Sequence, residues 1–205
     1  TYAIHTIQVK CSDINGNTSV ALTNQTSIII DLTAPIGLLV QFPSNSPTNI
    51  NNVPITIPLD AITWEYSIDN GSTWSTQERT TSTFLLTEGE YEINTIQVTC
   101  SDVAGNISSI ISNNDKIIID LTAPVGLTVS FPSTTTPTNR EKTVSVTSMP
   151  SDAVSWEYSV NNGSTWVTAQ DPLISSSFTL LDGIYGINAI RVKCVDSAGN
   201  YSAYV

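Results

Sequence analysis

Residues 64–74 read WEYSIDNGSTW, and nearly the same stretch returns at 156–166 as WEYSVNNGSTW. In both copies apolar residues alternate with polar ones up to an Asn-Gly pair, which is the pattern of a β-strand entering a hairpin turn. Because the hairpin recurs with so little change, the sequence predicts a repeated β-unit. We therefore expect an all-β protein with its units in tandem.

Other phrases recur in the same order. The stretch IIIDLTAP at 28–35 returns at 117–124, and similar phrases surround Cys11, Cys100 and Cys194. Cys11 and Cys100 are 89 residues apart (100 − 11), and Cys100 and Cys194 are 94 apart (194 − 100). A unit of about 90 residues has the size of one small β-sandwich domain.

Each unit is expected to be an immunoglobulin-like Greek-key β-sandwich of about seven short strands, with almost no helix. Tyr91 and Tyr185 stand where such a fold places a tyrosine corner. A one-residue slip in the apolar alternation at Asn94-Thr95 predicts a β-bulge. In the complete unit we expect strand A near 36–43, B near 53–59, C near 62–68, a further strand from 74 onward, E near 82–87, F near 91–101 and G near 115–120.

Three domains are predicted from the repeat. They are the F–G hairpin of a partial repeat at 1–31, a complete domain at 32–120, and a domain lacking the end of its last strand at 121–205. No signal-peptide pattern is visible at Thr1, so we expect a mature segment or a piece of a longer array. Alternatively, the hairpin and the open sandwich complete neighbouring chains by strand exchange, which would make a filament or surface-layer subunit.

Composition disfavours several classes of partner. Eighteen acidic residues against seven basic ones give a net charge of −11, so phosphate backbones and anionic membranes would repel the chain. No apolar run approaches the roughly 20 residues that cross a membrane as a helix. The three cysteines occupy one repeated position, and each is expected to be a small buried side chain rather than part of a disulfide framework.

Catalysis finds little support in the residues. The only histidine, His5, lies in a strand pattern, and no glycine-rich phosphate loop is present. Glu65 and Glu157 are on strands but are expected to face away from the Trp64 side, so a glycosidase pair is not favoured. We expect that the protein is not an enzyme.

The four tryptophans leave a binding function open. Trp64 and Trp156 occupy the position where a sandwich core takes its large aromatic residue. Trp74 and Trp166 follow the hairpin turn and are expected to be partly exposed, with packing favoured over carbohydrate stacking. A carbohydrate- or protein-binding module is therefore the alternative to a structural role.

Taken in order, the phrases IIIDLTAP, WEYSIDNGSTW, EGEYEINTIQV and DVAGN resemble the bacterial Ig-like (BIg) repeats of giant surface adhesins exported by type I secretion. The resemblance covers the whole chain. It implies a stalk of stacked sandwiches at the cell surface or outside the cell. The partners would be neighbouring repeats of the same chain, with a host-surface or glycan ligand elsewhere in the parent protein. The strand-F cysteine departs from the family, whose secreted repeats usually avoid cysteine.

The resemblance also implies Ca²⁺ at the domain junctions, where it would stiffen the linkers. Calcium takes six to eight oxygen ligands, with carboxylates prominent, and acidic residues are placed where the ends of successive domains meet. The alternative is that each aspartate caps its own turn through backbone N–H groups. The residues are Asp31, Asp60, Asp102 and Asn106 at the first junction, and Asp120, Asp152, Asp196 and Asn200 at the second, joined there by Asp69, Glu88 or Glu90 of the preceding domain.

Overall fold

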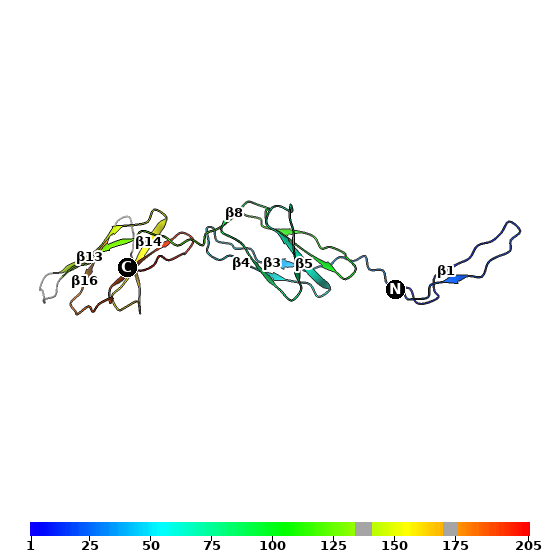
Figure 1. Cartoon of the computed structure of the whole chain (residues 1–205), viewed down its shortest axis with the longest axis horizontal. Helices are drawn as coiled ribbons and strands as arrows, with labels where there is room; N and C mark the ends of the chain where they lie inside the picture. The colour runs from blue at the N-terminus through cyan, green and yellow to red at the C-terminus, as the bar shows by residue number, and fades with distance from the viewer. Residues whose placement is uncertain (134–140, 170–175) are drawn as a thin grey trace. The chain divides into compact units, whose positions relative to one another are not determined.

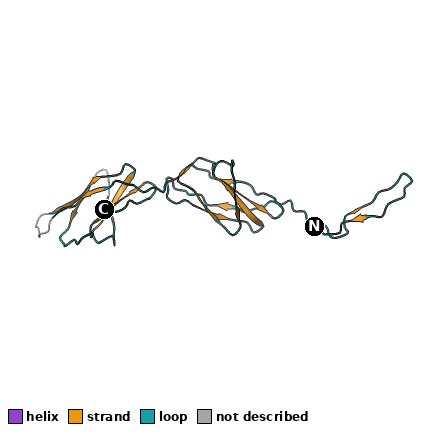
Figure 2. Ribbon diagram, in the orientation of Figure 1, coloured by secondary structure: helices purple, strands orange, loops and turns teal. Residues whose placement is uncertain are grey.

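The computed structural model describes residues 1–133, 141–169 and 176–205. Within these ranges every regular element is a β-strand, as Figure 2 shows, and all pairs of named strands are antiparallel. None of the described residues forms a helix able to cross a membrane. The expected all-β, immunoglobulin-like class is confirmed.

The chain divides into two compact units. The first comprises residues 1–40, 55–82 and 96–112, and the second comprises residues 41–54, 83–95 and 113–205. The domain boundaries predicted from the repeat remain predictions.

The first unit contains the sheet formed by the repeated hairpin. Its strands are β5 (Ala61–Ser67), β6 (Ser75–Glu78), β9 (Gln97–Asp102) and β10 (Ile111–Ser112), in the order β10-β9-β5-β6. Strand β5 is labelled in Figure 1. Because side chains alternate across a strand, one face of β5 and β9 is apolar and buried. Trp64 is fully buried there, as predicted, together with Val98 and Cys100.

The N-terminal hairpin consists of β1 (Gln8–Val9) and β2 (Leu22–Thr23), which pair only with each other. Nearly all residues of 1–31 are exposed, including Cys11. The prediction that all three cysteines are buried is therefore wrong for Cys11, because no second sheet covers this two-stranded ribbon. Cys100 and Cys194 are buried as expected.

The second unit holds two three-stranded sheets that pack face to face. Strands β12 (Thr128–Ser130), β13 (Lys142–Ser148) and β16 (Ser177–Leu180) form one sheet, and β14 (Ala153–Ser159), β15 (Val167–Thr168) and β17 (Arg191–Asp196) form the other. The two apolar faces meet where Tyr158 stacks on Phe178 with ring centroids 3.8 Å apart. Trp156, 1% exposed, lies in the same core, as predicted.

The remaining strands form two further small sheets. Strand β8 (Gly89–Tyr91) pairs with β11 (Ile117–Ile119), while β3 (Leu39–Val40), β4 (Asn52–Thr56) and β7 (Thr83–Leu85) form a three-stranded sheet. Most of these strands are shorter than the alternation predicts.

The bulge predicted in strand F is instead a turn that divides it. Strand β8 ends at Tyr91 and β9 begins at Gln97, and the two belong to different sheets. Between them Asn94 takes a left-handed φ of 64°, and the N–H of Thr95 donates to the Glu92 carbonyl at 3.0 Å. Asparagine tolerates this conformation better than most residues.

Both tyrosine corners are confirmed. The Tyr91 hydroxyl donates to the Thr87 carbonyl at 3.0 Å, and the Tyr185 hydroxyl donates to the Leu181 carbonyl at the same distance. Each bond fixes the chain where it crosses from one sheet to the other.

Candidate functional site

The turns that follow the cysteine strands share one geometry. In 196–200 the Asp196 Oδ1 accepts the N–H groups of Ala198 at 2.9 Å and Asn200 at 2.8 Å, while Oδ2 accepts Nδ2 of Asn200 at 2.9 Å. Asp102 in 102–106 and Asp13 in 13–17 accept the equivalent three bonds. Each aspartate thus organises its own turn, as the turn-cap alternative predicts.

These hydrogen bonds lower the pKa of all three carboxyl groups. The Asn106 side-chain amide is the main cause of the lowered pKa of Asp102, and the Asn17 amide does the same for Asp13. At Asp196 burial raises the pKa most strongly as a single effect, but the Asn200 side-chain amide and the backbone N–H groups together outweigh it. Its pKa therefore also lies below the usual value.

The same turns hold the incoming linkers. Nδ2 of Asn106 donates to the Asp31 carbonyl at 3.2 Å, and Nδ2 of Asn200 donates to the Asp120 carbonyl at 2.9 Å. The structure thus brings together three of the predicted residues at each junction. The linkers contribute backbone carbonyls to these bonds.

The linker aspartates use their carboxylates locally. Oδ1 of Asp31 accepts the N–H of Thr33, and Oδ1 of Asp120 accepts the N–H of Thr122, both at 3.0 Å. The Thr122 hydroxyl donates to Glu88, with its oxygen 2.9 and 2.8 Å from the two carboxylate oxygens. This bond places Glu88 beside the linker at the second junction.

Other predicted ligands lie elsewhere. Asp69 caps its own hairpin by accepting bonds from the Thr73 N–H and hydroxyl and from the Ser67 hydroxyl. Those bonds, the Thr73 hydroxyl first, lower the pKa of Asp69 to about 2. Glu90 instead forms an ion pair with Lys116 at 2.6 Å.

Asp60 and Asp152 take part in none of these junction hydrogen bonds. Burial raises the pKa of the Cys100 thiol, and the negative charge of Asp60 adds a smaller increase in the same direction. At Cys194, burial and the charge of Asp152 act in the same sense. Both aspartates therefore lie near a strand-F cysteine.

Calcium would need more converging oxygens than these arrangements supply. Across residues 1–133, 141–169 and 176–205, no three His, Cys, Asp or Glu residues are grouped so as to hold a metal ion. The carboxylates named above are already hydrogen-bonded in separate small networks. As arranged here the residues do not fit the ion, and junction calcium remains a prediction from the sequence.

The loop 46–49 contributes to the second junction and was not singled out from the sequence. The N–H of Asn49 donates to the Ala198 carbonyl at 3.1 Å, and its Nδ2 donates to the Gly199 carbonyl at 3.0 Å. Thr48, 5% exposed, pairs with the end of β11. A signal was available, because the letters Pro-Thr-Asn at 47–49 recur at 137–139, outside the described residues.

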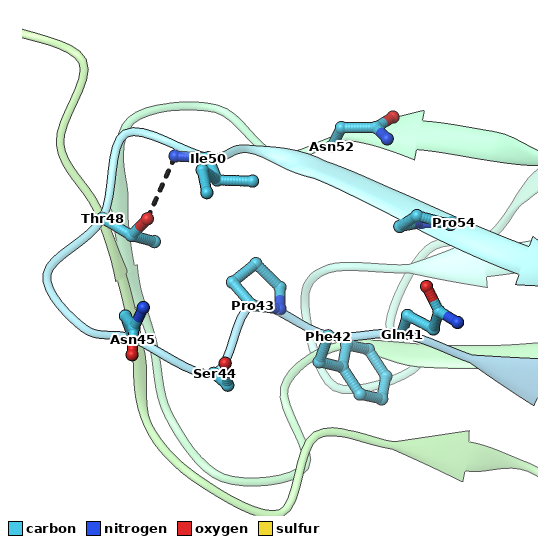
Figure 3. Close-up of a pocket in the computed structure, with 9 residues that line it drawn as sticks. All are labelled: Gln41, Phe42, Pro43, Ser44, Asn45, Thr48, Ile50, Asn52 and Pro54. Carbon is cyan, nitrogen blue, oxygen red and sulfur yellow. Dashed lines mark hydrogen bonds between the residues drawn. The ribbon is translucent and has the colours of Figure 1, made fainter.

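A recess of about 270 Å³ lies along residues 41–54 of the second unit, next to this loop. Figure 3 shows its lining, which ranges from Phe42 and Pro43 to Thr48 and Ile50 and carries no charged side chain. The Thr48 hydroxyl accepts the N–H of Ile50 at 3.1 Å across one end. Such a lining offers neither an acid–base pair nor a nucleophile with its base.

The tryptophans that follow the hairpins are used locally. Trp74, 36% exposed, donates its indole N–H to the Gly71 carbonyl at 3.1 Å. Trp166 is half-buried beneath the Lys193 ammonium, whose nitrogen lies 4.3 Å from the ring centroid. The same ammonium pairs with Glu157 at 3.2 Å.

Comparisons with known proteins concern the fold. No protein-family model matches the chain, and no curated protein sequence matches it. Similar solved structures include fibronectin(III)-like modules of Clostridium thermocellum CbhA, at 14% identity and a TM-score of 0.46, covering 82% of this chain and 90% of that one. A two-domain fibronectin type III segment of chicken tenascin is 19% identical, with a TM-score of 0.30 and coverages of 84% and 97%. The FN1–FN3 domains of chicken CNTN1 are 13% identical, with a TM-score of 0.30 and coverages of 97% and 74%.

Proposed function

We propose that this chain is a non-catalytic spacer of tandem immunoglobulin-like repeats, part of a stalk in a cell-surface or secreted adhesin. The observation that carries the proposal is the repeated linker bond. Asn106 holds the carbonyl of Asp31, and Asn200 holds the carbonyl of Asp120. A contact that recurs at each junction is what a periodic stalk requires.

The second junction has further bonds that restrict the linker. Glu88 accepts the hydroxyl of Thr122 two residues beyond Asp120, and the Asp120 N–H donates to the Thr48 carbonyl at 3.0 Å. Short linkers tied by several hydrogen bonds bend less than free ones. We therefore expect each repeat to add a fixed length to the stalk.

A binding module remains the second candidate function. The exposed apolar residues of the hairpin 1–31, such as Val9 and Leu22, are the kind of surface that partner chains cover. Repetition of nearly the same loops in each unit favours the spacer, because a unique ligand site would need a unique loop.

The spacer is tested by residual dipolar couplings measured on the full chain by NMR. If the repeats at 32–120 and 121–205 are rigidly joined, their amide couplings fit one common alignment tensor. Two unrelated tensors with different degrees of order would refute a stiff spacer.

Calcium is tested separately by thermal melts in excess Ca²⁺ and in EGTA. A bound ion at 100 times its dissociation constant adds about 2.7 kcal/mol, which raises the midpoint of a domain of this size by roughly 10 °C or more. Such a shift would support junction calcium through Asp31 and Asp102 or through Asp120, Asp196 and Glu88. Coincident curves would leave the hydrogen bonds as the stabilising element of the junctions.

A further inference from the structure

We propose that the Asp-x-x-Gly-Asn turn of each repeat binds a loop of the preceding repeat, namely the loop equivalent to residues 46–49. In the repeat at 32–120 the residue that makes this contact is Asn49. The inference rests on the proposed spacer and names the surface that joins its units. All residues of the joint that the structure describes belong to the second compact unit.

The turn becomes a receptor because its donors face inward. The N–H groups of Ala198 and Asn200 are bound to the Asp196 carboxylate, and that of Gly199 points at the Asp196 carbonyl, 3.4 Å away. With these N–H groups used inside the turn, the carbonyls of Ala198 and Gly199 remain as acceptors for an outside partner.

Asn49 matches those two acceptors with two adjacent donors. Its backbone N–H binds the Ala198 carbonyl, and its side-chain amide binds the Gly199 carbonyl. Gly199 has a φ of +94°, and a Cβ there would stand 3.6 Å from Nδ2 of Asn49. That distance is an ordinary van der Waals contact, so glycine is favoured here by the left-handed turn rather than by the space that the amide needs.

The docking residue is itself fixed to the end of its own repeat. Thr48 donates its N–H to the Ile118 carbonyl and accepts the N–H of Asp120, both at 3.0 Å. Asn200 of the turn donates to the Asp120 carbonyl of the linker. The hydrogen bonds therefore form a closed ring in which the loop binds the turn, the turn binds the linker, and the linker binds the loop. Closed networks of this kind reinforce their members.

The same receptor geometry is present twice more. Oδ1 of Asp102 binds the N–H groups of Ala104 and Asn106, and Asp13 binds those of Asn15 and Asn17. Each of these turns would bind the equivalent loop of a preceding repeat. The loop would present a side-chain amide and an adjacent backbone N–H to the carbonyls of the turn.

The test compares residual dipolar couplings of the wild-type chain, Asn49→Ala, and the control Asn45→Ala, whose residue immediately precedes the loop. Loss of one hydrogen bond of ordinary strength shifts the ratio of docked to undocked repeats about fivefold. We expect Asn49→Ala to lower the degree of order of repeat 121–205 relative to 32–120, with both repeats still folded by thermal melt. Asn45→Ala should match the wild type.

A second measurement does not depend on a variant. The backbone amide of Asn49 is bound to the Ala198 carbonyl and should exchange with solvent far more slowly than a free amide. If the wild type fits one tensor and Asn49→Ala fits it equally well, the docking role fails while the spacer stands. Unprotected exchange at Asn49 would also overturn it. Two tensors in the wild type would instead remove the spacer itself.

Discussion

Replacing Asp196 by alanine should destabilise the third repeat strongly. The carboxylate accepts three bonds, from the N–H groups of Ala198 and Asn200 and from the Asn200 side chain, at 2.8 to 2.9 Å. Asp196 is 4% exposed and Ala198 is 8% exposed, so water replaces the lost acceptor poorly. Hydrogen bonds to charged groups contribute about 1.5–3 kcal/mol each, and the carboxylate recovers its hydration in the unfolded chain. We expect a net loss of about 3 kcal/mol.

Urea denaturation followed by tryptophan fluorescence measures this loss, once in Ca²⁺ and once in EGTA. Asp196→Asn keeps one acceptor oxygen and should lose only about 1 kcal/mol. Asp13→Ala removes the same three bonds from an exposed turn, where water replaces them, so the denaturation midpoint of the repeats should not move. A loss below about 1 kcal/mol for Asp196→Ala would refute the turn-cap reasoning. So would a loss seen in Ca²⁺ but absent in EGTA, which would assign Asp196 to an ion instead.

Three further outcomes are expected. Asp69→Asn should destabilise the protein at neutral pH. Because the pKa of Asp69 falls from 3.8 to about 2 on folding, the difference in unfolding free energy between wild type and variant is fully present above about pH 4 and disappears as the pH falls toward 2. A difference in unfolding free energy that persists at pH 2 in urea titrations would contradict this. Trp64→Ala, which empties a fully buried site, should cost about 3–5 kcal/mol, whereas Trp74→Ala should cost under about 1 kcal/mol, both read from denaturation midpoints. Cys11 should react with a thiol reagent in the native state, while Cys100, whose pKa is raised by burial, should react only on unfolding, as mass spectrometry of labelled peptides would show.

The sequence predicts the fold well because its signals are local and repeated. The alternation around Trp64 and Trp156 leads directly to buried strands, and the tyrosine at each E–F corner makes the expected hydrogen bond. The division of strand F was missed, because a left-handed Asn94 looks in sequence like a one-residue slip. The exposure of Cys11 could not be predicted from its own strand, because it depends on whether a second sheet covers that strand.

The candidate site was predicted less completely. Convergence of Asp31 with Asn106 and of Asp120 with Asn200 followed from strand order, because linker and turn lie at the same end of the fold. The chemistry of that contact could not be read from the same letters, since an aspartate at a turn serves equally as an ion ligand or as a cap. Asn49 carries no charge, and the recurrence of Pro-Thr-Asn at 47–49 and 137–139 does not say what the asparagine binds, so its role is visible only from its two bonds in the structure.

The most direct test of the spacer is how length grows with repeat number. Chains carrying one, two and three head-to-tail copies of residues 23–205, in which residues 23–31 supply the strand end and the linker Asp31 at each new junction, can be imaged by electron microscopy and their end-to-end distances measured. Repeats held by the linker bonds and the Asn49 contact predict a distance that rises in direct proportion to the number of copies. A distance that rises only with the square root of that number, as for flexibly joined segments, would contradict the account.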